Sequence, residues 1–265
     1  MNKYLTSSQL KQNARQQLFG NVGTVIGAFL VHMLCTVPID YMLSSIGLNT
    51  PIRVTVFLIS SIIVDCFIST FLTGADFMAL NLACRQEVGV MDIFYGFKGL
   101  IMKTALVRVI PVTVATVVSI PVIMVANSIT KEIPSNEAIM EMLKRNDINE
   151  LYAFAEKMTP LYTLFFGVFA MFLVVSVLSD IIFSQTIFLM LDYPEKTPAE
   201  ILKLGLKVMK GNWGRYFYIM LSFIPWYLLA GLTCYISLAY SEPYKRLTYA
   251  NFYLDLMKKY QQDNK

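Results

Sequence analysis

The chain has 265 residues, of which 56% are hydrophobic and only 15% are charged. An ordinary soluble domain has about a quarter of its residues charged, so this chain holds more apolar residues than one water-soluble core can bury. The formal net charge of +4 is small, and the basic residues stand beside apolar runs. This arrangement suits contact with a membrane surface and argues against nucleic-acid binding.

Long apolar runs follow one another along the chain. A helix needs about 20 residues to cross a hydrocarbon layer of roughly 30 Å. The segment 1–20 is polar in its first turns and lacks the pattern of a cleavable signal peptide, so we expect a cytoplasmic interfacial helix there. The predicted fold class is an all-α polytopic transmembrane helical bundle with five clear spans, a sixth being favoured, at residues 21–45, 54–83, 101–127, 160–191 and 214–240.

The segment 197–211 carries the signals of an amphipathic cytoplasmic helix that lies in the membrane interface. Thr197 and Glu200 have the spacing of a capping box, in which a hydroxyl and a carboxylate satisfy free backbone N–H groups. Gly211 supplies a left-handed stop. Lysines recur on one face of this helix, and we predict contacts with anionic lipid headgroups from Lys203, Lys207, Lys210 and Arg215.

A similar construction opens the chain. Thr6 and Gln9 fit a second capping box, and the sequence GNVG at 20–23 echoes GNWG at 211–214. We therefore expect a unit made of one interfacial helix and one membrane hairpin, used about three times along the chain. Residues 84–100 would open the middle unit.

The distribution of basic residues predicts the orientation. Lysine and arginine are concentrated before the first apolar run, after the second and after the fourth, which puts the N-terminus in the cytoplasm. The C-terminal segment 241–265 is ambiguous, because five spans would leave it outside. We favour a split of the last run near Gly231 into two short helices, which returns Lys258 and Lys259 to the cytoplasm.

The long outer loop, residues 128–159, has apolar residues at roughly helical spacing. This pattern predicts an amphipathic helix or a pair of helices on the outer surface. Such a structure would either cap the bundle or present a docking surface to a partner protein.

Ionisable residues within predicted spans are costly and mark candidate functional sites. Asp65 falls near the middle of the second span. Arg108 lies roughly 10 Å from the cytoplasmic edge at 1.5 Å per residue, and an ion pair with Asp76 or Asp180 would accommodate it. That pair is either structural or part of a substrate or proton pathway. The candidate intramembrane polar site therefore consists of Asp65, Asp76, Arg108 and Asp180.

The sequence lacks the motifs of common catalytic and cofactor sites. His32 is the sole histidine and fits a hydrogen-bonded core position better than a metal site. The four cysteines show no paired spacing and are expected to be reduced. No P-loop, GxSxG, HExxH or GxGxxG pattern occurs. We predict no catalytic residue, no metal site and no cofactor.

The C-terminal half carries a distinctive set of residues, which are Met209, Gly211, Asn212, Arg215, Ser222, Phe223, Trp226, Leu232, Thr233, Pro243, Tyr244, Phe252 and Tyr253. With these residues it resembles a family of bacterial multi-pass membrane proteins described only as a domain of unknown function. The resemblance covers nearly the whole chain and departs at Gly205, where a serine is expected, and at Cys234–Ser237, where a glycine-containing turn is usual. A more remote similarity is to the membrane portion of bacterial glycerophosphodiester phosphodiesterases.

The resemblance implies a multi-pass protein of the bacterial cytoplasmic membrane without an established activity. Our leading hypothesis is a non-enzymatic accessory or regulatory component of the cell envelope or export machinery, which contacts membrane lipids and a membrane-protein partner or a second copy of itself. The alternative is a small transporter or permease that uses Asp65, Asp76, Arg108 and Asp180. A third hypothesis is an intramembrane enzyme with Asp65 and Asp180 as a carboxylate pair.

Overall fold

Every regular element of the described chain is a helix, which confirms the predicted all-α class. The computed structural model describes residues 4–46, 50–134, 140 and 148–263. Its elements in chain order are α1 (Ser7–Leu18), α2 (Val22–Ser44), α3 (Pro51–Ala83), the 3-10 helix η1 (Val90–Phe97), α4 (Ile101–Glu132), α6 (Ile148–Phe183), α7 (Thr186–Asp192), α8 (Pro198–Met209), α9 (Trp213–Leu221), α10 (Ile224–Leu232) and α11 (Leu238–Asp263).

Four helical stretches are long and apolar enough to cross a membrane, which indicates a membrane protein. They are Val22–Leu43, Pro51–Ala83, Ile101–Glu132 and Tyr152–Asp192.

The predicted fifth span, 214–240, is not one continuous helix. α9 ends at Leu221 and α10 begins at Ile224. Pro225 stands in the first turn of α10, and its missing N–H prevents it from continuing the preceding helix.

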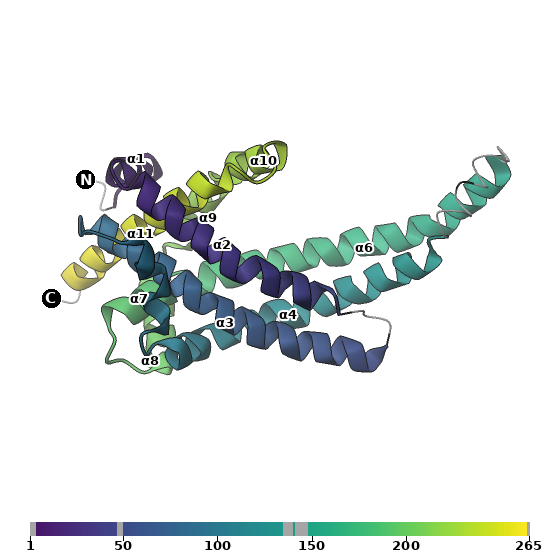
Figure 1. The fold of residues 1–265 in the computed structure, drawn as a ribbon, viewed down its shortest axis with the longest axis horizontal. Coiled ribbons are helices and arrows are strands. Elements are labelled where there is room, and N and C mark those ends of the chain that lie inside the picture. Colours follow the sequence, from purple (N-terminus) through teal and green to yellow (C-terminus); the bar gives the residue numbers. More distant parts are fainter. Residues whose placement is uncertain (1–3, 47–49, 135–139, 141–147, 264–265) are drawn as a thin grey trace.

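The last apolar run turns back on itself after α10. Residues 233–237 form the turn, in which Cys234 and Tyr235 have φ angles of 48° and 67°. α11 then returns to the region where the chain begins, and the backbone N–H of Leu5 donates to the carboxylate of Asp255 at 3.3 Å. The two termini lie at the same end of the molecule (Figure 1). The break thus falls just after the predicted position at Gly231.

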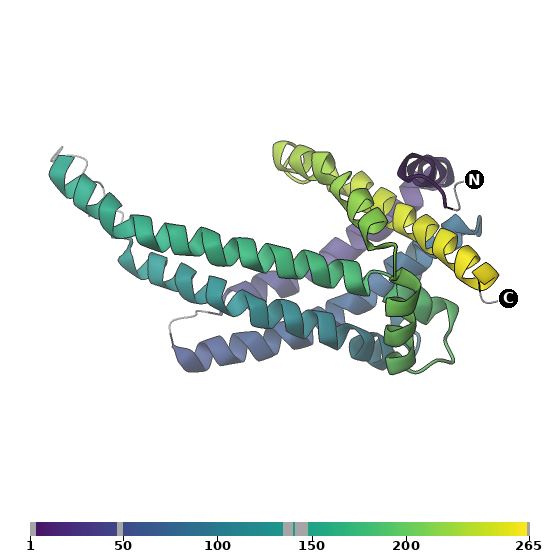
Figure 2. The same ribbon diagram turned by 180° about the vertical axis from the view of Figure 1, so that it is seen from behind.

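One end of the bundle contains short helices from several parts of the chain and is called the short-helix end below. It holds α1, η1, α7, α8 and the C-terminal part of α11 (Figure 1). The opposite end is formed by the C-terminal end of α2, the N-terminal end of α3 and the far ends of the longer helices α4 and α6. Figure 2 shows α4 and α6 side by side along most of their length, reaching beyond the other helices.

The same elbow precedes three of the apolar helices. Gly20, Gly99 and Gly211 have φ angles of 91°, 83° and 82°, values that a residue with a Cβ adopts only at a steric cost. The residue after each glycine is the N-cap of the helix that follows, and it has φ between −116° and −101° and ψ near zero. Both predicted capping boxes, Thr6 with Gln9 and Thr197 with Glu200, are also present.

These elbows support the predicted repeat of three units. The first unit is α1, α2 and α3, and the second is η1, α4 and α6. The third is α8, the broken helix α9–α10, and α11. Each unit begins at the short-helix end with a short element, passes through a glycine elbow and continues as a hairpin (Figure 1).

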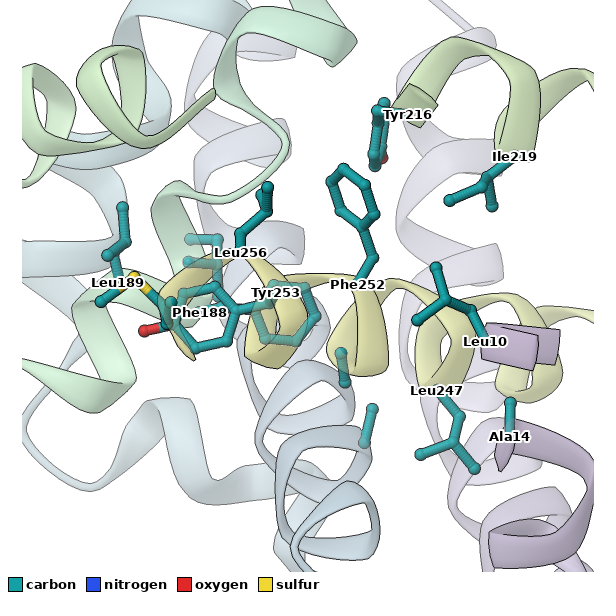
Figure 3. Close-up of a cluster of buried hydrophobic side chains, with 14 of the residues drawn as sticks. Leu10, Ala14, Phe188, Leu189, Tyr216, Ile219, Leu247, Phe252, Tyr253 and Leu256 are labelled. Carbon is teal, nitrogen blue, oxygen red and sulfur yellow. The ribbon is translucent and has the colours of Figure 1, made fainter. Parts of the chain in front are cut away.

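The largest buried cluster lies along α11 at the short-helix end. Phe252, Tyr253 and Leu256 of α11 point towards Phe188 and Leu189 of α7 on one side and Tyr216 and Ile219 of α9 on the other, with Leu10 and Ala14 of α1 beside them (Figure 3). The stripe of Leu10, Ala14 and Leu18 that the sequence shows on α1 is buried here. α11 is therefore the element on which the first and third units meet.

The 3-10 helix η1 crosses α3 with direct backbone contact. A Cβ atom built on Gly74 of α3 would lie 1.9 Å from the carbonyl oxygen of Ile93, and one built on Gly96 of η1 would lie 2.2 Å from the carbonyl oxygen of Thr70. The rings of Phe77 and Tyr95 stack beside this crossing, with centroids 3.6 Å apart. Only glycine at both positions permits this approach.

The predicted outer loop is largely a continuation of two apolar helices. α4 runs on to Glu132 and α6 begins at Ile148, so residues 128–132 and 148–159 extend these helices. An ion pair between Glu132 and Lys157 joins the two extensions. The middle of the predicted loop, residues 135–139 and 141–147, lies outside the described residues.

Candidate functional site

A pocket of about 310 Å³ lies between α2, α3 and α11. Most of its wall is apolar, with Phe29 and Met33 from α2 and Leu72 from α3. Four polar residues also line it, namely His32, Thr36, Glu242 and Arg246. Pockets that bind small ligands combine a mostly apolar wall with a few polar groups in this way, and their volumes begin near 300 Å³.

Arg246 connects the pocket to a buried ion pair. Its Nη1 donates to Oδ1 of Asp76 at 2.6 Å, and only 9% of the Asp76 side chain is exposed. The predicted ion pair of Arg108 with Asp76 or Asp180 is therefore wrong as far as Asp76 is concerned. α11 returns beside α3 and brings Arg246 closer to Asp76 than Arg108 comes.

A second ion pair stands one turn away on α11. Lys245 Nζ donates to Oε1 of Glu242 at 2.7 Å, and the hydroxyl of Tyr227 on α10 donates to the same oxygen at 3.0 Å. Both charged side chains are less than one-fifth exposed. Glu242 therefore faces the pocket with one carboxylate oxygen already engaged.

Arg108 on α4 and Asp180 on α6 lie beside this network of two ion pairs. Arg108 is near enough to Asp76, Arg246, Asp180 and Tyr216 to interact with them electrostatically, and Asp180 interacts in the same way with Arg108 and Lys245. Neither residue makes an ion pair within the described part of the chain. The Nε of Arg108 is buried and has no hydrogen-bond partner there.

Asp65 is not part of this network. It is exposed on α3, and the charge that acts on it is that of Asp40 on α2. Asp65 lies 18 residues before the end of α3 at Ala83, and Asp180 lies three residues before the end of α6 at Phe183. At 1.5 Å per residue, these depths from the short-helix end are about 27 Å and 5 Å. The two carboxylates therefore do not form the pair that an intramembrane enzyme would need.

The basic residues of α8 are exposed while its apolar face is buried against protein. Ile201, Val208 and Met209 are buried, and α8 packs on α4, α6, α7 and α11. Lys203, Lys207 and Lys210 are exposed. Their contact with anionic lipid stays a prediction, but the helix does not turn its apolar face to lipid.

Arg215 is held within the protein. Its guanidinium donates to Oδ2 of Asp255 at 2.8 Å, to the carbonyl of Leu5 at 2.9 Å and to Oδ1 of Asn212 at 3.1 Å. The side chain therefore joins α1, α9 and α11 at the short-helix end. Its predicted contact with a lipid headgroup stays a prediction.

The capping box of α8 affects the pKa of Glu200. The backbone N–H and the hydroxyl of Thr197 both donate to Oε2 of Glu200 at 2.8 Å. These hydrogen bonds hold the pKa of the Glu200 carboxyl below its usual range, because they stabilise the charged form.

Sequence reasoning missed three residues of the site, Glu242, Lys245 and Arg246. Their spacing of three and four residues places them on one face of a helix, a pattern visible once the segment after the turn is taken as helical. His32 lines the pocket, with its ring 5.9 Å from that of Phe71 and its Nδ1 buried without a hydrogen-bond partner among the described residues.

The remaining sequence-based expectations concern cysteines and metals. All four cysteines are free. Within the described part of the chain, no group of three or more His, Cys, Asp or Glu side chains is placed to hold a metal ion.

Comparison with known proteins gives a family. The family model for proteins of unknown function designated DUF975 matches residues 1–260. The chain belongs to the DUF975 family. No curated protein and no solved structure matches this DUF975 protein. Its remote similarity to the membrane portion of glycerophosphodiester phosphodiesterases stays a prediction.

Proposed function

We propose that this DUF975 protein is a non-enzymatic membrane protein that binds a small amphiphilic molecule in the pocket between α2, α3 and α11. The pocket itself carries the proposal, because apolar side chains from two long apolar helices meet Arg246 and His32 within it. A carrier and a sensor both bind their ligand, so a binding protein of this kind is compatible with the transporter alternative. Arg246, and not Asp65, would then contact the ligand.

The chemistry of the pocket selects the ligand class. One Arg246 nitrogen is engaged by Asp76, and a guanidinium has five N–H donors in all. The remaining donors and the unpartnered Nδ1 of His32 would meet one anionic or hydrogen-bond-accepting group. The rest of the ligand would be apolar, to match the side chains of Phe29, Met33 and Leu72. A medium-chain carboxylate such as decanoate has this form.

The depth of the pocket supports a ligand that enters from the membrane. His32 lies ten residues after the start of α2 at Val22, which is about 15 Å along a helix. If α9–α10 and α11 form the third membrane hairpin, with the termini in the cytoplasm of a bacterium, then the pocket lies in the cytoplasmic half of the bilayer.

The test measures binding of radiolabelled decanoate to the protein in lipid discs, with empty discs as background. Ala75 lines the pocket, and Ala75→Leu should fill it and weaken saturable binding at least tenfold. Ala170→Leu places the same side chain on an exposed position of α6 and should bind like the unaltered protein. Equal binding by both variants, or no saturable binding at all, would refute the proposal.

An accessory role is the second candidate, and the α4–α6 hairpin favours it. This hairpin reaches beyond the other helices (Figure 2), and its extension exposes apolar side chains at Ile133, Ile148 and Tyr152. Exposed apolar patches of this kind mark contacts with a protein or with the membrane, and a partner protein is the contact that an accessory role requires. Crosslinking from a photoreactive residue at position 152 in native membranes should capture a stoichiometric partner if the accessory role is correct.

A further inference from the structure

Two buried polar atoms at a similar depth on α4 and α6 have no hydrogen-bond partner among the described residues. They are Nε of Arg108 and Oγ of Ser176. Arg108 lies seven residues after the start of α4 at Ile101, and Ser176 lies seven residues before the end of α6 at Phe183. Both are therefore about 10 Å from the short-helix end on helices that pack against each other.

Within this network, as far as the structure describes it, Arg108 and Asp180 are the charged groups that make no ion pair. Asp76 is engaged by Arg246, and Glu242 is engaged by Lys245. Arg108 and Asp180 remain, and they act on each other electrostatically without an N–O contact within 4.0 Å among the described residues. Asp180 is exposed and lies one helical turn after Ser176.

Such an arrangement is costly in the absence of a ligand. A buried donor without a partner is destabilising, and more so when it is charged. Arginine and aspartate within membrane spans are likewise costly when they are not paired. A bound group that accepts from Arg108 and donates to Asp180 would offset both costs, whereas an anion alone would meet repulsion from Asp180.

We propose that Arg108, Ser176 and Asp180 form a second binding site, which takes a zwitterionic headgroup bearing a phosphate and a primary amine. The phosphate oxygens accept from Arg108 and from the Ser176 hydroxyl, because guanidinium–phosphate hydrogen bonds are among the strongest in proteins. The ammonium group donates to the Asp180 carboxylate. This site is separate from the pocket that Arg246 lines and does not depend on the function proposed for it.

Either a lipid or a free solute could supply this headgroup chemistry. An apolar groove of about 530 Å³ between α6 and α9 favours the lipid. Ile181, the residue after Asp180, lines this groove together with Val177 and Phe217. None of Arg108, Ser176 and Asp180 lines this groove, so a lipid would have to place its acyl chain there and extend its headgroup around α6 to the site.

The experiment uses the full-length protein, delipidated in detergent and then supplied with phosphatidylethanolamine, phosphatidylcholine or phosphatidylglycerol. Native mass spectrometry measures how much of each lipid is retained. We expect at least a tenfold preference for phosphatidylethanolamine. Phosphatidylcholine has no N–H to donate to Asp180, and phosphatidylglycerol has no amine.

Two variants test the residues. Asp180→Asn should abolish the preference over phosphatidylcholine, and the fold should persist because Asp180 is exposed. Arg108→Lys retains the charge but loses the paired donors, and it should lower retention at least tenfold. Arg53→Met removes an exposed cation at the opposite end and should change nothing. Thermal unfolding of each variant identifies loss of fold.

The outcomes separate the possibilities. The proposal is refuted if the unaltered protein does not prefer phosphatidylethanolamine over the other two lipids. It is also refuted if Asp180→Asn folds and retains the preference over phosphatidylcholine, because the site then does not recognise the ammonium group. If free phosphoethanolamine binds as tightly as the lipid and needs the same two residues, the headgroup chemistry stands and a soluble ligand replaces the lipid. If it competes only weakly, the acyl chain contributes and the lipid is the ligand.

Discussion

Replacement of Gly74 by alanine tests the backbone crossing of α3 and η1. The added Cβ would lie 1.9 Å from the carbonyl oxygen of Ile93 and 2.4 Å from its carbonyl carbon. An ordinary carbon–oxygen contact is about 3.3 Å, so η1 would have to move by roughly 1.4 Å. The obstacle is backbone, which cannot rotate away as a flexible side chain can.

The expected loss of stability follows from two opposing effects. Overpacking costs typically 1–3 kcal/mol, and a clash with backbone belongs near the upper limit. Alanine regains up to about 1 kcal/mol of helix propensity relative to glycine. The net loss is about 2 kcal/mol, which corresponds to a melting temperature lower by roughly 4–8 °C in a chain of this size.

The assay is thermal unfolding in detergent, followed by the fluorescence of Trp213 and Trp226. Gly167→Ala is the matched control, because nothing lies within 4 Å of a Cβ at that position of α6. The control should melt at the same temperature as the unaltered protein or slightly above it. If Gly74→Ala behaved like the control, η1 would not cross α3 at this distance and the reasoning would fail.

Three further predictions concern the turn, the ion pair and the capping box. Tyr235 has a positive φ, so Tyr235→Gly should stabilise the protein by about 1 kcal/mol, and Tyr235→Ala should give no gain in thermal unfolding. Asp76→Asn leaves Arg246 unpaired and should lower the free energy of unfolding by about 3–5 kcal/mol. The double variant Asp76→Asn with Arg246→Gln should recover most of that loss. An equally unstable double variant would contradict the pairing. Since the folded-state pKa of Glu200 is depressed, its stabilising contribution is present above its ordinary pKa of about 4.3 and is lost as pH falls through the lower folded value. Unfolding midpoints measured against pH should therefore show Glu200→Gln converging with the unaltered protein only in acid.

Local signals in the sequence predicted local structure well. The capping boxes at Thr6 and Thr197 are present because the residues that form them are three positions apart, so nothing distant is needed. The bounds of α2 agree with the predicted span 21–45 within one residue at each end, because its apolar run is bounded by polar residues.

The sequence alone could not predict which residues far apart in the chain form ion pairs. Asp76 and Arg246 are 170 positions apart, and only the return of α11 against α3 brings them together. Arg108 was the nearer basic residue on an adjacent predicted span, so it was the natural but incorrect partner for Asp76. The break between α9 and α10 did have a local signal in Pro225, but prolines lie inside α2, α4 and α6 without ending them.

The three-unit construction has a consequence for how such a chain can change in length. Every unit starts and finishes at the short-helix end, so the chain enters each new unit from the same end (Figure 1). Loss or gain of a whole unit would leave every other unit facing the same way, whereas loss of one helix would invert everything after it. A whole unit can therefore be added or removed without reversing the rest of the chain, which a single helix cannot.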